Sequence, residues 1–240
     1  MPHFPLQWVN SDFVISVSLL LKGIKPMYNI NKKQMLDDLV KRYPSLLCVR
    51  NELEKTFEAV YSSYMNGGKL LVCGNGGSAA DSEHIVGELM KSFRLKRPID
   101  TKVAQELALM GDDGEYIADK LEGALPAIAL CSHTALSTAF GNDKDSDITF
   151  AQQVYGYGQP NDVLLCLTTS GNSRNCIYAA KVARAKGMSV VSITGEGGGK
   201  IKDFSDVCIE VPERETYLVQ ELTLPVYHWL CAELEEAFWG

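Results

Sequence analysis

A loop rich in hydroxyl side chains is the first candidate for chemistry in this sequence. The loop Thr168–Ser173 reads TTSGNS and stands directly before a segment with helical periodicity. Hydroxyl groups and the free N–H groups of a helix N-terminus can surround a phosphate without supplying charge. Ordinary helix capping needs one hydroxyl, and Ser173 is placed to supply it. The further hydroxyls of Thr168, Thr169 and Ser170 exceed that need and favour a phosphate site.

A second loop, Gly74–Ala79 (GNGGSA), follows a short apolar run and precedes another helical segment. Its glycines allow the backbone to approach an anion closely, and the following helix presents free N–H groups and the positive end of its dipole. A structural turn that binds nothing has the same composition, so this alternative stays open. The candidate ligand contacts in this loop are Asn75, Gly76, Gly77 and Ser78.

The same loop fits the pattern G-x-G-x-x-A of dinucleotide-binding folds. That function requires an acidic residue at the end of the next strand, about 20 residues further on. Here the next strand-like run comes much later and ends in Cys131-Ser132-His133. The sequence therefore predicts that the protein uses no nucleotide cofactor.

Two helical segments carry groups suited to proton transfer or metal binding. His84 and Glu88 are spaced i, i+4 and share one helix face, which suits an acid/base pair, two metal ligands or a surface hydrogen bond. Near the C-terminus, Gln220 and Glu221 precede His228, and Glu221 lies two helical turns before it. The residues alone leave these alternatives open.

Short apolar runs that alternate with helical segments must position these groups. Such runs are typical of parallel strands whose sheet is covered on both faces, and ligands of such sheets bind at the carboxyl ends of the strands. Both loops follow such a run directly. The predicted strands are Lys69–Cys73, Ala127–Cys131, Val163–Leu167, Ser189–Thr194 and Val207–Val211.

Helical patterns precede and follow the strands. Residues 32–66 are predicted to be helical with an interruption at Pro44, and Thr216–Phe238 is predicted to be a long closing helix that contains Pro225. The polar segment Pro98–Pro126 does not follow the alternation. We expect it to be an inserted flap or oligomer contact with a helical stretch at Glu115–Leu121.

Composition excludes several classes of protein. The 240 residues are 46% hydrophobic and 22% charged with a formal net charge of −7, which predicts a globular chain with no nucleic-acid partner. The one dense basic run, Lys91–Arg97, is interrupted by apolar residues and is predicted to be solvated or to contact another subunit.

The cysteines and the N-terminus indicate the compartment. The seven cysteines are odd in number and form no C-x-x-C pair, which favours reduced thiols and a cytoplasmic location. Cys73, Cys131, Cys166 and Cys208 are expected to be buried. The apolar stretch Phe13–Ile24 is too short to span a membrane and lacks the features of a signal peptide, so no membrane association is predicted.

Three segments, in order and at matching intervals, carry a resemblance to a known family. They resemble the sugar isomerase (SIS) domain, and within it the sedoheptulose-7-phosphate isomerase (phosphoheptose isomerase) branch, over roughly residues 53–238. FGND (Phe140–Asp143) and ITGEGGGK (Ile193–Lys200) fit the same family. The three segments are CGNGGSAADSEHIVGEL (Cys73–Leu89), LTTSGNS (Leu167–Ser173) and VQELTLPVYH (Val219–His228).

The resemblance implies an architecture. We expect an α/β protein with a flavodoxin-like three-layer fold: a five-stranded parallel sheet, N-terminal helices and a long C-terminal helix. Residues 27–240 would form a single SIS domain with an insertion at about 98–126, and residues 1–26 would be an N-terminal extension. The resemblance also implies a homotetramer with active sites between subunits.

The resemblance further implies a chemistry, namely aldose–ketose isomerisation of a phosphorylated sugar through an enediol. The expected reaction converts sedoheptulose 7-phosphate to D-glycero-D-manno-heptose 7-phosphate, with Glu88 as general base and His228 as its acid/base partner. The alternative is a non-catalytic SIS module, such as a partner of the replication initiator or a regulator that binds a sugar phosphate. The family's phosphate contacts fall on Ser78, Thr168, Ser170 and Ser173, and its sugar contacts on Asn75 and Asp143, to which we add Gly76, Gly77, Asn142, Thr169 and Gln220.

Some members of the family bind Zn²⁺, and the corresponding ligands here are His84, Glu88, Gln220 and His228. The sequence also departs from the family. Ser92 and Leu218 stand where the family usually has arginine, and Thr168 replaces a common serine. These departures affect the expected length and stereochemistry of the sugar more than the phosphate.

Overall fold

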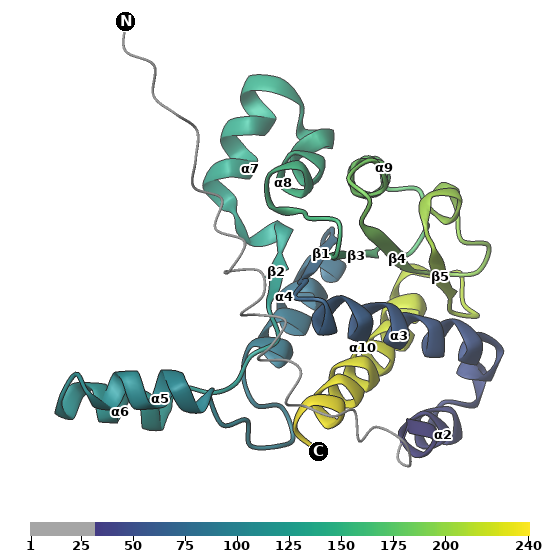
Figure 1. Cartoon of the computed structure of the whole chain (residues 1–240). Helices are drawn as coiled ribbons and strands as arrows, with labels where there is room; N and C mark the ends of the chain where they lie inside the picture. Colours follow the sequence, from purple (N-terminus) through teal and green to yellow (C-terminus); the bar gives the residue numbers. More distant parts are fainter. Residues whose placement is uncertain (1–31) are drawn as a thin grey trace, which may run out of the picture.

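A five-stranded parallel sheet forms the centre of the computed structural model, which describes residues 32–240. The strand order is β2-β1-β3-β4-β5, in which the chain begins inside the sheet, adds one edge and then crosses to the other side (Figure 1). This is the flavodoxin-like order that was predicted. The strands are β1 (Leu70–Gly74), β2 (Ala127–Ala129), β3 (Val163–Leu167), β4 (Ser189–Thr194) and β5 (Val207–Glu210).

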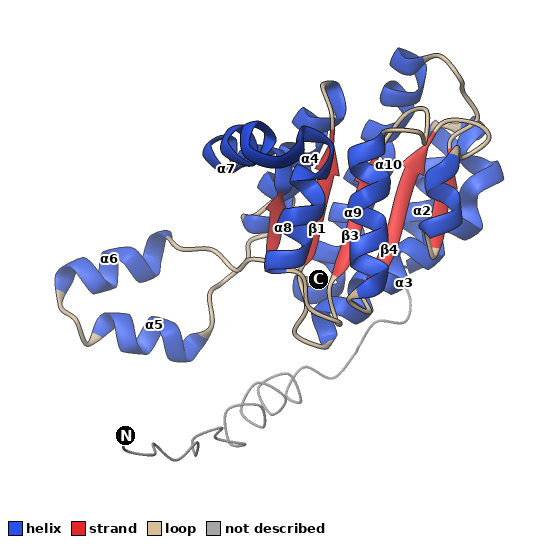
Figure 2. Cartoon of the chain, turned by 90° about the horizontal axis from the view of Figure 1, so that it is seen from above, coloured by secondary structure: helices blue, strands red, loops and turns tan. Residues whose placement is uncertain are grey.

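Helices cover both faces of the sheet (Figure 2). Between them lie short 3-10 or π turns, η2 (Pro44–Val49), η3 (Leu130–Ser132), η4 (Gly141–Asp145), η5 (Ser146–Ile148) and η6 (Lys200–Phe204). The α-helices are α2 (Lys32–Arg42), α3 (Arg50–Met65), α4 (Gly77–Met90), α5 (Thr101–Ala108), α6 (Asp112–Lys120), α7 (Thr134–Phe140), α8 (Thr149–Tyr157), α9 (Arg174–Ala185) and α10 (Thr216–Trp239).

The alternation of side chains along each strand builds two cores. Leu70 and Val72 pack into the core formed with α2, α3, α4 and α10, whereas Leu71 and Cys73 pack into the core formed with α8 and α9. Every residue of β1 is buried, as a strand covered on both faces requires. The three-layer prediction is therefore confirmed.

Most predicted elements agree with the structure to within a few residues. β3 and β4 have the predicted bounds, and α10 continues through Pro225. β2 ends at Ala129 instead of Cys131 because the chain turns there into η3. No helix was predicted in residues 134–157, where α7 and α8 lie; α7 is short and buries none of its residues.

Cysteine burial follows the position of each strand in the sheet. All seven cysteines are free. Cys73 and Cys166 lie on the central strands β1 and β3 and are fully buried. The prediction was wrong for Cys131 and Cys208, which are only partly buried, because Cys131 lies in η3 just after the edge strand β2 and Cys208 lies on the edge strand β5.

The segment at 98–126 contains two helices instead of the one predicted. α5 and α6 form a hairpin that stands away from the sheet (Figures 1 and 2). The helices meet at Gly114, where a Cβ atom would collide with the carbonyl oxygen of Leu107. Its role as a flap or oligomer contact stays a prediction. The expected extension at 1–26 lies outside the described residues, and no helix within residues 32–240 is long and apolar enough to cross a membrane.

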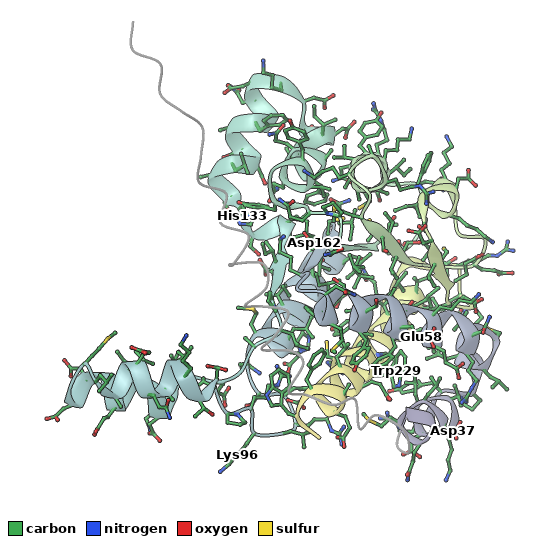
Figure 3. All side chains as sticks on the ribbon, in the orientation of Figure 1. Asp37, Glu58, Lys96, His133, Asp162 and Trp229 are labelled. Carbon is green, nitrogen blue, oxygen red and sulfur yellow. The ribbon has the colours of Figure 1, made fainter. Side chains whose placement is uncertain are left out.

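Asp162, labelled in Figure 3, joins the starts of β1 and β3, at the end of the strands opposite the two loops. Its side chain is 1% exposed and accepts hydrogen bonds from the backbone N–H groups of Lys69 (2.9 Å) and Gln159 (2.7 Å). The Lys69 ammonium lies 2.6 Å from the same carboxylate.

We expect Asp162→Ala to lower the free energy of unfolding by about 2–4 kcal/mol, because two backbone donors and an ammonium lose a charged acceptor. Urea unfolding measures this change. Asp119→Ala is the matched control, since its pair with Lys120 is exposed to solvent and should contribute little to stability. Equal and small effects of the two substitutions would contradict the prediction.

Candidate active site

The hydroxyl-rich loop after β3 has the form of an anion cradle. Ser173 stands at the N-cap of α9, yet its side chain makes no capping hydrogen bond; instead its hydroxyl accepts one from Thr168 Oγ1 at 3.1 Å. Gly171 adopts a φ of 65°, and a Cβ there would collide with the carbonyl oxygen of Gly198. The hydroxyl of Ser170 accepts the N–H of Asn172 at 3.2 Å. The capping alternative for Ser173 is therefore wrong.

The glycine-rich loop after β1 lies beside it, because β1 and β3 are neighbours in the sheet. The side chains of Asn75 and Asn175 exchange two hydrogen bonds of 2.9 and 2.8 Å, which join this loop to the first turn of α9. Gly76 has a φ of 57° and open space around it, and α4 begins at the next residue. The exposed loop backbone thus faces solvent at the N-terminus of a helix.

A cluster of ionisable groups lies further along α4. His84 Nε2 is 3.4 Å from Glu88 Oε1, and the ring centroids of His84 and His228 are 5.0 Å apart. The Glu88 side chain is 13% exposed, and Lys91 Nζ lies 3.5 Å from its other oxygen. The predicted acid/base groups of two helices are therefore brought together.

Tyr227 and Asp81 hold this cluster, and neither residue was predicted. The phenol of Tyr227 donates to Asp81 Oδ1 at 3.2 Å and lies 3.0 Å from His84 Nδ1. Because the phenol proton goes to Asp81, the Tyr227 oxygen is free to accept a hydrogen bond from His84 Nδ1, while His84 Nε2 faces the Glu88 carboxylate. Burial and the charge of Asp81 raise the pKa of Tyr227, so the phenol stays a donor.

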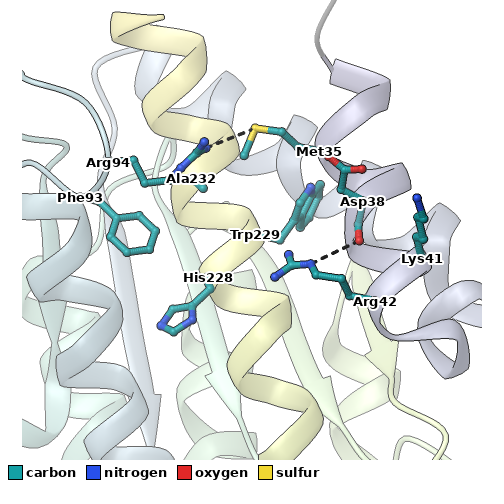
Figure 4. A pocket seen from close by; sticks show the side chains of 9 residues that line it. All are labelled: Met35, Asp38, Lys41, Arg42, Phe93, Arg94, His228, Trp229 and Ala232. Atoms are coloured by element: carbon teal, nitrogen blue, oxygen red, sulfur yellow. Dashed lines mark hydrogen bonds between the residues drawn. The ribbon is translucent and has the colours of Figure 1, made fainter.

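His228 is held as a neutral imidazole. Burial, and then the neighbouring His84, lower the pKa of His228, which keeps its imidazole neutral near pH 7. Its Nε2 atom is buried and has no hydrogen-bond partner. The side chain also reaches a groove of about 730 Å³ between α2, α10 and the turn after α4 (Figure 4).

Gln220 lies apart from this cluster. A Cβ atom on Gly77 would lie 2.6 Å from Gln220 Nε2, so Gln220 stands beside the first turn of α4, at the glycine-rich loop. His84 and His228 lie about two turns further along their helices, or about 11 Å at 1.5 Å per residue. Within one chain, Gln220 therefore belongs to the end of the site where the two loops lie.

The donor atoms fit zinc in kind, since two imidazoles and a carboxylate are its usual ligands and the orphaned His228 Nε2 needs a partner. Within residues 32–240, however, no three His, Cys, Asp or Glu side chains are arranged to hold a metal ion. Zinc at His84, Glu88, Gln220 and His228 therefore stays a prediction.

Asn142 and Asp143 are not brought to the loops. They lie exposed on the π-helical turn η4, where Asn142 Nδ2 donates to Asp143 Oδ1 at 3.0 Å. No hydrogen bond or ion pair of the described residues joins them to the two loops. Their role as sugar contacts stays a prediction.

Comparison with known proteins agrees with this geometry. The SIS domain family model matches residues 48–123 and 117–195. Phosphoheptose isomerase from Rhodospirillum rubrum is 40% identical over 178 residues, which cover 74% of this chain and 81% of that protein. The Akkermansia muciniphila enzyme of the same name is 34% identical over 202 residues, or 84% of this chain and 94% of that protein. The chain belongs to the phosphoheptose isomerase family of SIS domains.

A solved phosphoheptose isomerase shares the fold. The structure from Francisella tularensis has a TM-score of 0.67 and 26% identity, and the match covers 94% of this chain and 96% of that one. Ser92, where the resemblance led us to expect a departure from the family, lies in the turn after α4. Its hydroxyl accepts the N–H of Arg97 at 3.3 Å, and its own N–H donates to Glu122 at 2.8 Å, so it shapes the turn after α4.

One prediction about the basic run Lys91–Arg97 was wrong. Arg97 is only 2% exposed, and its guanidinium is paired with Glu235 of α10 at 2.7 Å. Sequence spacing carries no signal for this pair, because its members lie far apart in the chain. Asp81 could have been found, since it shares a helix face with His84 at i, i+3.

We expect Ser170→Ala combined with Ser173→Ala to weaken the binding of a sugar phosphate about a hundredfold or more. Hydrogen bonds to a charged group contribute about 1.5–3 kcal/mol each, and neither hydroxyl caps α9. Calorimetric titration measures the affinity, and thermal melting of the free proteins measures the fold. Ser189→Ala, at the opposite end of the strands, is the control. Unchanged affinity in the double variant would refute the phosphate cradle.

Proposed function

We propose that this chain is an aldose–ketose isomerase that converts sedoheptulose 7-phosphate to D-glycero-D-manno-heptose 7-phosphate. One observation carries the proposal: Glu88 of α4 and His228 of α10 both lie beside His84, further along α4 from its N-terminus, where the two loops that would bind the phosphate meet. A sugar phosphate that spans the two ends places its phosphate in the loops and its carbonyl end beside Glu88. The proposed identity of the substrate is supported by the relatives named phosphoheptose isomerase.

The reaction moves a proton between C1 and C2 of the sugar. In the proposed mechanism, the Glu88 carboxylate takes the proton from one carbon, which leaves an enediol, and returns it to the neighbouring carbon. The side chain is largely buried, so bulk water has little access to the proton while it is held.

His228 moves the second proton, between the carbonyl and hydroxyl oxygens. A neutral imidazole can accept a proton from the hydroxyl and deliver it to the other oxygen, and the lowered pKa of His228 keeps it in this neutral form. His84, Tyr227 and Asp81 form a hydrogen-bonded chain that orients the cluster.

We propose that a zinc ion, where one is bound, is held by His84, Glu88 and His228; the remaining family ligand, Gln220, lies too far back along α10 to join them within one chain. When bound, the zinc ion would polarise the carbonyl of the sugar. The chain is further proposed to act as a homotetramer in the cytoplasm, with active sites between subunits. Free thiols support the compartment, and the groove beside His228 leaves room for a neighbouring chain.

The test is an assay of the purified protein with sedoheptulose 7-phosphate, with and without added zinc. Glu88→Gln should lower kcat at least about a hundredfold, because general acid–base catalysis contributes at least that much. Its affinity for inorganic phosphate should stay that of the parent. Glu58→Gln, an exposed position on α3, is the matched control and should keep full activity (Figure 3).

Two outcomes would contradict this proposal. Activity of Glu88→Gln within about tenfold of the parent would remove Glu88 as the base. A parent protein that binds the sugar phosphate tightly but does not isomerise it would support the non-catalytic alternative.

A further inference from the structure

Arg97 and Glu235 form an ion pair at the end of α4 that lies away from the cradle, and the side chains of both are 0% exposed. All three nitrogens of the Arg97 guanidinium donate hydrogen bonds. Nε donates to Glu235 Oε1 at 2.7 Å, Nη1 to the carbonyl oxygen of Leu89 at 2.7 Å, and Nη2 to that of Glu88 at 2.9 Å. The face of the Trp239 ring lies 4.9 Å away. Arg97 thus binds side chain and backbone groups of two helices at once.

The Glu235 carboxylate is equally occupied. It accepts the backbone N–H groups of Phe93 (2.8 Å), Arg94 (2.7 Å) and Leu95 (3.1 Å) in addition to Arg97. These donors all lie in the turn that follows α4. The side chain of Glu235 on α10 therefore binds the backbone of residues 93–95, which follow α4.

The ion pair of Arg97 and Glu235, with the hydrogen bonds described above, is called the clamp below. It matters because of the unpaired carbonyl groups at the end of α4. The last carbonyl groups of a helix lack partners within the helix, and α4 has no basic residue in its last turn. Arg97 fills this role for two of the carbonyls, and one of them belongs to Glu88 itself. On the other helix, Glu235 lies two turns beyond His228. The clamp therefore joins the turn that carries Glu88 to the helix that carries His228.

We propose that Arg97 and Glu235 are positioning residues for the isomerase reaction: their ion pair sets the separation of Glu88 and His228. This inference rests on the proposed function, because it takes Glu88 and His228 as the groups that move protons. Proton transfer needs its partners within a narrow range of distance, so a small displacement of one helix end would slow the chemical step. Substrate binding would be spared, because the phosphate cradle lies at the opposite end of α4.

Arg97→Lys is the sharpest test. Lysine keeps the charge opposite Glu235, but an ammonium is a point charge and lacks the planar fork that reaches both carbonyl groups. We expect kcat with sedoheptulose 7-phosphate to fall about tenfold or more, with KM within about threefold of the parent. Glu235→Gln should act in the same direction. Arg184→Lys, in an exposed pair with Asp206, is the control and should change neither constant.

A readout independent of turnover accompanies the kinetics. Amide hydrogen exchange at residues 93–95 should become faster in Arg97→Lys and Glu235→Gln, because their N–H groups depend on the clamp. Thermal melting and titration with inorganic phosphate give the folded fraction and the state of the cradle. Unchanged exchange would overturn the inference whether or not the protein is an isomerase.

The kinetic outcomes separate the two hypotheses. Where the parent is active and Glu88→Gln is not, a folded Arg97→Lys or Glu235→Gln with kcat within about twofold of the parent overturns the positioning role alone. A fall in kcat that only matches the loss of folded protein would also overturn it. An inactive parent would refute the proposed function instead, and the exchange data would still decide whether the clamp exists.

Discussion

Helices α4 and α10 lie side by side and run in the same direction, and this contact places Gln220 and the cluster of ionisable groups in the candidate site. Gly77 meets Gln220 at one end, and His84 meets Tyr227 and His228 further along. Because both helices rise about 1.5 Å per residue, residues further along α4 lie beside residues further along α10. In the proposed function, the end at Gly77 would bind the phosphate, and the end at His84 and His228 would transfer protons.

The two loops of the proposed phosphate site contain no lysine or arginine. The chain carries a formal net charge of −7, yet two helix N-termini and a set of hydroxyls converge where β1 and β3 end. Backbone N–H groups and hydroxyls keep their geometry without a counterion, so they can select a phosphate by shape. The proton-transfer end relies on burial, which keeps His228 neutral and Tyr227 protonated.

Besides Asp162 at the starts of β1 and β3, a buried ion pair lies at the far ends of the same helices. Burial raises the pKa of the Glu235 carboxyl, but hydrogen bonds from Phe93, Arg94 and Arg97 outweigh burial and hold the pKa below its ordinary value. A buried ion pair that is fully hydrogen-bonded contributes little net stability compared with apolar packing. Its advantage is geometric, because it allows one arrangement of the helix ends and makes others costly.

The amino-acid sequence by itself determined the strands, the two loops and the pair His84 and Glu88, because each is a local pattern of apolar runs, glycines or i, i+4 spacing. It could not show that Arg97 is buried, that Gln220 stands beside Gly77, or that Tyr227 links Asp81 to His84. Each of these depends on contacts between α4, or the turn after it, and α10, which lie more than a hundred residues apart in the chain. Only the packing of the tertiary structure decided them, since burial and pairing are properties of neighbours in space.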